Sequence, residues 1–405
     1  MYKDRKKNNN LFIMENKYKI NDTRELDNFK KSSFSGYKRG DIFTQFQKSC
    51  DEHKLENALF WVTEIHCSQA LDELFEKIFI YISTKIHLNS YHLPLIVWNH
   101  YLYWKHLSNN HINEQRLRNS LFEIAALLVQ CETGRVLHKK KAIKDTEFNI
   151  QKLSKMITCS TNHISTSIIK QKDPKVLTIV INELSYCLIK HKDIQGNIQD
   201  KKVQNRGFYM EKAVYWISWL HKWEIIQKKK GGSPDCAHRE VTDVLPEDSC
   251  DIVWIIWSVI LAECRRRVND KCIPHIAALF NMYKYRFSRN KKSTRISIII
   301  HVLALLILDD APISKTELTN PYIIQAVMKC NDIYMTKKKF ECSVKLPAPD
   351  LFSINPLKDT KVNKEKGGKG KKGKKELSIR TIESIRKFDL MMKIDRDRQN
   401  KNPEY

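Results

Sequence analysis

The chain has 405 residues, with 71 Lys and Arg against 46 Asp and Glu, and carries a formal charge of +25 at pH 7. Apolar residues make up 42% of it, which is enough for two or three domain-sized units with cores and excludes a wholly disordered chain. The excess of positive charge favours polyanionic partners, with nucleic acid first among them. An AT-rich genome would also fill a surface with Lys, Asn and Ile, so the charge has a second explanation.

The cysteine pattern and the apolar runs indicate a soluble intracellular protein. The 11 cysteines are scattered singly, without a CxxC pair, which is typical of reduced thiols. The start MYKDRKKNNN is charged and lacks the apolar stretch of a signal peptide. The longest apolar run, ISIIIHVLALLIL at 296–308, is shorter than the roughly 20 residues of a membrane-spanning helix and contains His301. We therefore expect a buried core helix there and no membrane association.

The first half of the chain reads as a polar arm followed by helices. Residues 1–45 show no sustained apolar period, which predicts a disordered N-terminal arm. From 46 to 227, apolar residues recur at helical spacing, as in ALDELFEKIFIYIS and LRNSLFEIAALLVQ, and predict an N-terminal helical domain. Near its end, Trp216, Trp219 and Trp223 are spaced to share one helix face, which needs covering.

A change of composition predicts where this domain ends. Residues 228–250 are rich in Gly, Pro and acidic turn residues and predict a linker, after which 251–346 predict a C-terminal helical domain. Residues 347–405 form a basic, low-complexity tail, whose last part has an apolar face suited to a short amphipathic helix. The expected fold is all-α, a multi-helix bundle in two halves with a disordered N-terminal arm and a basic C-terminal tail.

No catalytic or cofactor motif emerges. The tail segment GKGKKGKK, 368–375, has P-loop spacing but lacks the Ser or Thr that would hold magnesium, and no strand precedes it. Cys236 and His238 are one residue apart, unlike the paired ligands of structural zinc. Nucleophile elbows, HExxH motifs and catalytic carboxylate pairs are absent from the sequence. We expect no catalytic residue, metal or cofactor, with an enzyme of dispersed site residues as the alternative.

Two basic segments are candidates for phosphate contact. In MYKYRFSRNKKSTR, 282–295, aromatic residues interleave with cations, which suits stacking on bases but also fits a helix end with aromatics inward and cations in water. The lysines of the tail would neutralise phosphates without fixed geometry, serve as a nuclear-import signal, or only solvate the chain. The predicted nucleic-acid-binding residues are Lys284, Arg286, Arg289, Lys291, Lys292, Arg295, Lys366, Lys369, Lys371, Lys372, Lys374 and Lys375.

Residues 56–98 resemble the helical collar that follows the ATPase domain in clamp-loader-type proteins of the RarA/MgsA group. The comparable positions are Ala58, Leu59, Trp61, Asp72, Ile78 and Ser83. Because this chain has no ATPase domain, the resemblance does not imply ATP hydrolysis. Together with DIVWIIWSVILAECRRR and FNMYKYRFSRNKKSTRISIIIHVLALLIL, the same segment is similar to uncharacterised helical proteins of nucleocytoplasmic large DNA viruses. That similarity implies a viral protein acting in an infected cell.

We therefore expect a non-enzymatic helical scaffold that binds nucleic acid, DNA rather than RNA, in viral replication, transcription or genome packaging. It would act in the host cytoplasm or nucleus, or in the virion. The alternative is a protein-interaction module or virion component without nucleic-acid binding. In that case the tryptophan faces and the C-terminal amphipathic helix would contact other proteins.

Overall fold

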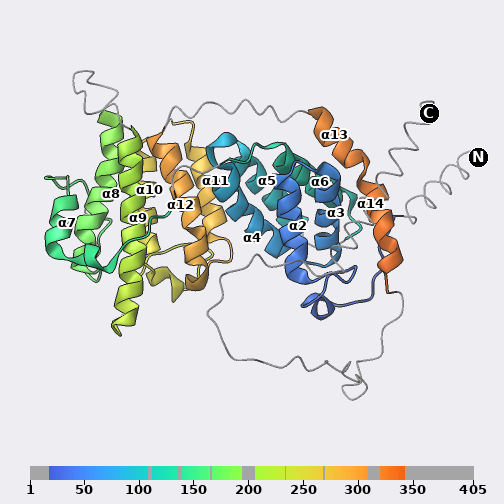
Figure 1. Cartoon of the computed structure of the whole chain (residues 1–405), viewed down its shortest axis with the longest axis horizontal. Helices are drawn as coiled ribbons and strands as arrows, with labels where there is room; N and C mark the ends of the chain where they lie inside the picture. The colour runs from blue at the N-terminus through green and yellow to red at the C-terminus, as the bar shows by residue number, and fades with distance from the viewer. Residues whose placement is uncertain are drawn as a thin grey trace, which may run out of the picture. The chain divides into compact units, whose positions relative to one another are not determined.

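The computed structural model describes residues 18–107, 112–134, 139–164, 167–193, 206–232, 234–267, 270–308 and 320–342. Within these ranges the regular structure is helical without a β-strand, and one isolated backbone bridge joins Ser32 to Lys38. The predicted all-α class is thus confirmed. The helices fall into two compact units (Figure 1), each assembled from separate stretches of the chain. The first 17 residues and the tail from 347 lie outside the described residues.

Unit 1 joins the two ends of the described chain. Its described residues come from 18–71, 112–129 and 320–342. In Figure 1 the orange helices α13 and α14 lie beside the blue α3, on which both pack, and α2 packs on α3 as well. Its elements are η1 (Leu26–Phe29), α2 (Arg39–Asp51), α3 (Leu55–Cys67), α6 (Gln115–Gln130, whose last residue belongs to unit 2), α13 (Asn320–Met328), α14 (Cys330–Lys337) and η8 (Lys338–Phe340).

Residues 18–45, expected to belong to an unpacked arm, are instead part of unit 1. Phe29 and Phe34 are buried, and the guanidinium of Arg24 lies over both rings, 5.0 and 4.6 Å from their centroids. Cations stack favourably on aromatic faces, and two buried rings contribute substantial apolar burial. The sequence signal was missed because these aromatics lie in an irregular segment without helical period.

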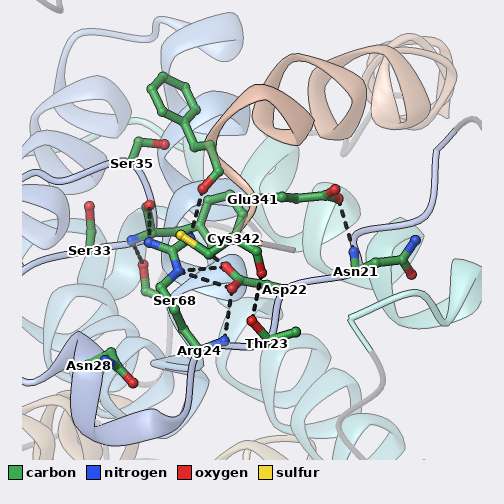
Figure 2. A network of polar contacts seen from close by, with 12 residues as sticks. Asn21, Asp22, Thr23, Arg24, Asn28, Ser33, Ser35, Ser68, Glu341 and Cys342 are labelled. Carbon is green, nitrogen blue, oxygen red and sulfur yellow. Dashed lines mark hydrogen bonds and ion pairs between the residues drawn. The ribbon is translucent and has the colours of Figure 1, made fainter. Parts of the chain in front are cut away.

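The same segment is hydrogen-bonded to the last described residues (Figure 2). The backbone N–H and the hydroxyl of Thr23 both donate to the carbonyl of Cys342, at 3.1 and 2.7 Å. The N–H of Asn21 donates to the Glu341 carboxylate at 2.9 Å, and Arg24 donates to the carbonyl of Phe340 at 2.9 Å. These bonds satisfy backbone groups that no helix would satisfy. They close unit 1 across more than 300 residues of sequence.

Unit 2 is built around α12, which packs on α8, α9, α11, η2 and η3. From Ile298 to Ile307 every residue of α12 is buried, including His301, so the predicted core helix is confirmed. The elements of unit 2 are α4 (Leu71–Tyr81, whose first residue belongs to unit 1), η2 (a π-helix, Ile82–Ile86), η3 (His87–Asn89), α5 (Leu93–His106), η4 (Asp145–Phe148), α7 (Ile150–Met156), α8 (Lys175–Asp193), α9 (Arg206–Lys229), η6 (Asp248–Cys250), α10 (Val253–Arg266), α11 (Ile273–Lys284), η7 (Arg289–Lys291) and α12 (Lys292–Ile307).

Helix α9 carries the three tryptophans that the sequence places on one face. Trp216, Trp219 and Trp223 are all buried, and α9 packs on both α8 and α12. Helices α8 and α12 therefore cover this face within unit 2. It follows that these side chains are not available to another protein on the surface of the unit.

The segment 228–250, predicted as a linker, lies within unit 2, and the two units divide the chain at other positions. Arg239 of this segment is buried and pairs with buried Asp173, at 2.7 Å from Nη2 to Oδ2. The N–H of Ala237 donates to the same carboxylate at 2.8 Å. A low apolar content suggested an exposed connection, but a buried and fully paired charge holds this segment in place.

A second buried ion pair fastens α14 to α3 in unit 1. Lys337 Nζ lies 2.5 Å from Glu64 Oε2, and neither side chain is exposed to solvent. Ser33 Oγ and the N–H of Ser35 donate to the other carboxylate oxygen, at 2.5 and 2.6 Å. Burial by itself would raise the pKa of Glu64, but attraction to Lys337 and the hydrogen bonds from lysine and serines outweigh it and hold the pKa below its ordinary value.

We predict that Lys337→Met destabilises the protein by about 3–5 kcal/mol, because it leaves the Glu64 carboxylate buried without its cation. Adding Glu64→Gln should restore part of the loss, since the remaining amide carbonyl can still accept from the serines. Equilibrium denaturation with urea measures both effects. As a control, Lys30→Met breaks the exposed pair with Asp27 and should cost less than about 1 kcal/mol. Equal losses for Lys30→Met and Lys337→Met would contradict the assignment.

Candidate nucleic-acid interface

The aromatic residues of segment 282–295 face the interior of unit 2. Tyr283 and Phe287 are buried against Trp254, with ring centroids 5.9 and 4.8 Å from it. Tyr285 packs on Tyr101 at 4.9 Å. Of the two arrangements that fit the sequence, the structure shows the helix end with inward aromatics. These rings do not form an exposed platform on which bases could stack.

Three of the predicted cations in this segment, Lys284, Lys292 and Arg295, are buried. The ammonium of Lys292 pairs with Glu224 and, at 2.7 Å, with Asp251 Oδ2. Arg295, whose side chain is 1% exposed, donates to Glu76 Oε1 at 2.8 Å and to the carbonyl of Tyr283 at 2.7 Å. Contact with a phosphate would require breaking these pairs and leaving carboxylates buried. Lys292 and Arg295 thus hold α12 within unit 2.

Lys284 and the other three predicted cations of the segment also have carboxylate neighbours. The N···O distances are 3.8 Å for Lys284 to Asp243, 3.7 Å for Arg286 to Asp72, 2.6 Å for Arg289 to Asp235 and 2.9 Å for Lys291 to Glu76. Arg286 is the most open of them, with 51% of its side chain exposed. The segment therefore presents little uncompensated charge. The predicted tail residues, Lys366, Lys369, Lys371, Lys372, Lys374 and Lys375, lie outside the described residues.

Another basic surface forms where segment 139–144 runs along α9. The N–H of Lys141 donates to Ser218 Oγ at 2.9 Å and fixes the segment on the helix. Lys140 Nζ then lies 3.2 Å from His221 Nδ1 and 3.4 Å from Ser293 Oγ. We call the lysine surface the set formed by Lys139, Lys140, Lys144, His221, Lys222 and Lys229.

Lysines outnumber carboxylates on the lysine surface. Asp145 pairs with Lys222 at 2.9 Å. The hydrogen bond and charge of Lys222 lower the pKa of Asp145, and Lys229 lowers it further, which locates both lysines beside the segment. Within the described ranges, no carboxylate forms an ion pair with Lys139, Lys140, Lys144 or Lys229. Their charge is available to an external anion.

Burial, and after it the charge of neighbouring lysines, lowers the pKa of two titratable groups at the centre of the lysine surface. The pKa of His221 is lowered to about 4, first by burial and then by the charges of Lys140 and Lys292. Burial, followed by repulsion from Lys292, also lowers the pKa of Lys140. The negative charge of a phosphate placed against Lys140 would offset the repulsion from Lys292. The arrangement therefore offers electrostatic attraction for a polyanion.

The sequence signal for this surface consists of two separate runs of lysines. Three consecutive lysines occur at 139–141 and three more at 228–230, nearly 90 residues later. Neither run is periodic or interleaved with aromatics, so each resembles an ordinary solvated segment. Only the path of segment 139–144 along α9 brings part of both runs together.

The described residues show neither a metal-binding cluster nor a membrane-spanning helix. Across the described stretches, no group of three or more His, Cys, Asp or Glu side chains is arranged to hold a metal ion. No helix in those same stretches is both long and apolar enough to cross a bilayer. Cys236, weighed as a zinc ligand from the sequence, donates its backbone N–H to the carbonyl of Cys250 at 2.8 Å. That bond closes the turn-rich segment before α10.

No family model, no curated protein and no solved structure matches the chain. The resemblance to collar helices and to viral proteins therefore rests on the quoted sequence segments alone. The chemistry of the chain has to be inferred from its own charges and their partners.

Proposed function

We propose that the protein is a non-enzymatic helical scaffold that binds nucleic acid through the lysine surface of unit 2, assisted by the lysines of 364–375. The observation that carries the proposal is the contrast between two sets of cations. Those of 284–295 have carboxylate partners, whereas Lys139, Lys140, Lys144 and Lys229 have none among the described residues. Uncompensated lysines attract the phosphate backbone regardless of base sequence.

The proposed binding is electrostatic and tolerant of sequence. Four lysines on phosphates would give a slope of about −3.6 in log affinity against log salt, hence a loss of roughly 150-fold between 50 and 200 mM. DNA is the preferred partner, in replication, transcription or genome packaging of a virus. The site of action would be the host cytoplasm or nucleus, or the virion. This setting is proposed from the sequence resemblance and the Lys-, Asn- and Ile-rich composition.

The triple variant Lys139→Gln, Lys140→Gln, Lys229→Gln should bind duplex DNA at least 10-fold more weakly at low salt. Its salt slope should be shallower by about 2.7, because three phosphate contacts are lost. Fluorescence anisotropy of a labelled duplex in a salt series measures both quantities. The control is Lys30→Gln, Lys48→Gln, Lys54→Gln, which removes equal charge from exposed, carboxylate-paired lysines of unit 1. A flat salt response of the native chain, or equal losses in both variants, would refute the proposal.

The titration of His221 offers a test that is independent of affinity. Lys140→Gln should raise the pKa of His221 from about 4, because one of the charges opposing its protonation is removed. Saturating oligo(dT) should raise it in the native chain, since phosphates neutralise Lys140. NMR titration of the histidine ring signals follows both shifts. If oligo(dT) binds yet leaves the His221 pKa unchanged, binding occurs away from the lysine surface.

The alternative function, a protein-interaction module, is favoured by an exposed apolar pair on α13. Ile324 and Met328 are 57% and 77% exposed and one turn apart, while the tryptophans of α9 are buried. On this alternative, a protein partner would stay bound after nuclease treatment and be lost in Ile324→Asp, Met328→Asp. Affinity capture from infected cells, with and without nuclease, would decide. Loss of all partners on nuclease treatment would exclude it.

A further inference from the structure

Unit 2 contains a pocket between α8 and α10, bordered by residues 162–164, 167 and 168. Its volume is about 560 Å³, within the range of roughly 300–1,000 Å³ found for sites of small molecules. The side of the pocket formed by the two helices is largely apolar, with Leu188 and Ile189 from α8 and Val259 and Ala262 from α10. An apolar group of a ligand would be removed from water there.

The polar lining of the pocket carries positive charge. Arg265 and Arg266 line it from the end of α10, and Glu263 is the one acid among its lining residues in the described part of the chain. The carboxylate of Glu263 is already engaged, because it accepts from buried Arg267 Nε at 2.8 Å and pairs with Arg266. For Arg265, the described residues provide no acidic partner. An anionic group would find uncompensated charge at this end.

Ser185 contributes a buried hydroxyl group whose hydrogen-bonding capacity is unused among the described residues. Its side chain lines the pocket from α8, the residue is 4% exposed, and Oγ has no hydrogen-bond partner among the described residues. Buried hydroxyls are usually hydrogen-bonded, since an unsatisfied one costs about 1–3 kcal/mol. A ligand oxygen would satisfy it. This is independent of the arginines as an indication that the pocket receives a polar group.

The walls of the pocket are fixed before any ligand arrives. Arg267 donates to the carbonyls of Leu188 and Leu306, at 3.2 and 2.8 Å, and so ties the end of α10 to α8 and α12. The N–H of His163, which lines the pocket, donates to Asn182 Oδ1 of α8 at 2.7 Å. A preformed pocket loses little entropy on binding, which favours a small ligand over a disordered peptide.

We propose that this pocket binds a small amphipathic carboxylate, with its apolar chain against Leu188, Ile189, Val259 and Ala262 and its carboxylate on Arg265. Arginine suits this role because its planar guanidinium pairs with both carboxylate oxygens at once. Ser185 donates a hydrogen bond to a ligand oxygen. The pocket uses none of the residues of the lysine surface, so the two sites are independent.

The test is isothermal titration calorimetry of the full chain with dodecanoate, below its micellar concentration, compared with dodecanol and dodecylamine. One dodecanoate per chain should bind, at least 10-fold more tightly than the alcohol, and the amine should not bind. Arg265→Gln should weaken dodecanoate binding about 10-fold and leave dodecanol binding unchanged, because only the anion uses the guanidinium. Arg286→Gln, an exposed arginine outside the pocket lining, is the matched control and should change neither.

A second variant keeps the test decisive. Ala262→Trp would fill the apolar side and should abolish binding of both dodecanoate and dodecanol, while circular dichroism checks that the helices persist. Absence of dodecanoate binding to the native chain would overturn the proposal. So would equal binding of the amine, or binding unaffected by both Arg265→Gln and Ala262→Trp.

Discussion

A charged side chain buried in a helical bundle needs an opposite charge or several hydrogen-bond partners, and both units of this protein contain buried ion pairs. Glu64 forms an ion pair with Lys337, Asp173 with Arg239, and Lys292 with both Glu224 and Asp251. The partners are 273, 66 and 41 to 68 residues apart. Apolar packing alone accepts many registers between helices, whereas a buried pair accepts one. We infer that these pairs determine which helix surfaces meet.

This constraint also changes the meaning of the net charge. A formal +25 suggests a surface covered with binding lysines. Yet the most suggestive basic segment, 282–295, uses its cations to hold α11 and α12 in place, with Arg295 on Glu76 and Lys292 on Asp251. The charge left for external partners lies where the fold provides no carboxylate, as around Lys140. A count of basic residues cannot separate these two uses, because pairing is a property of the tertiary structure.

Much of the fold could be predicted from the sequence where burial follows a helical period. The apolar run of α12 and the tryptophan face of α9 are of this kind, because one repeating interval specifies the buried side. The packing of residues 18–45 and 228–250 could not be predicted in this way, since it depends on single side chains such as Phe34 and Arg239. The lysine surface and the pocket each combine residues from separate segments. No local sequence pattern shows that these segments lie side by side, so only the three-dimensional structure reveals the lysine surface and the pocket.

The construction of unit 1 from both ends of the described chain has a consequence for synthesis on the ribosome. Lys337 is made 273 residues after Glu64, a delay of roughly 14–55 s at about 5–20 residues per second. All described residues of unit 2 emerge before α13 and α14 do. During that interval the nascent α3 carries a carboxylate without its cation, and Thr23 lacks the carbonyl of Cys342. The described residues of unit 1 before α4 thus lack part of their packing until α13 and α14 have been made, and a ribosome stalled in between would expose an incomplete core to chaperones.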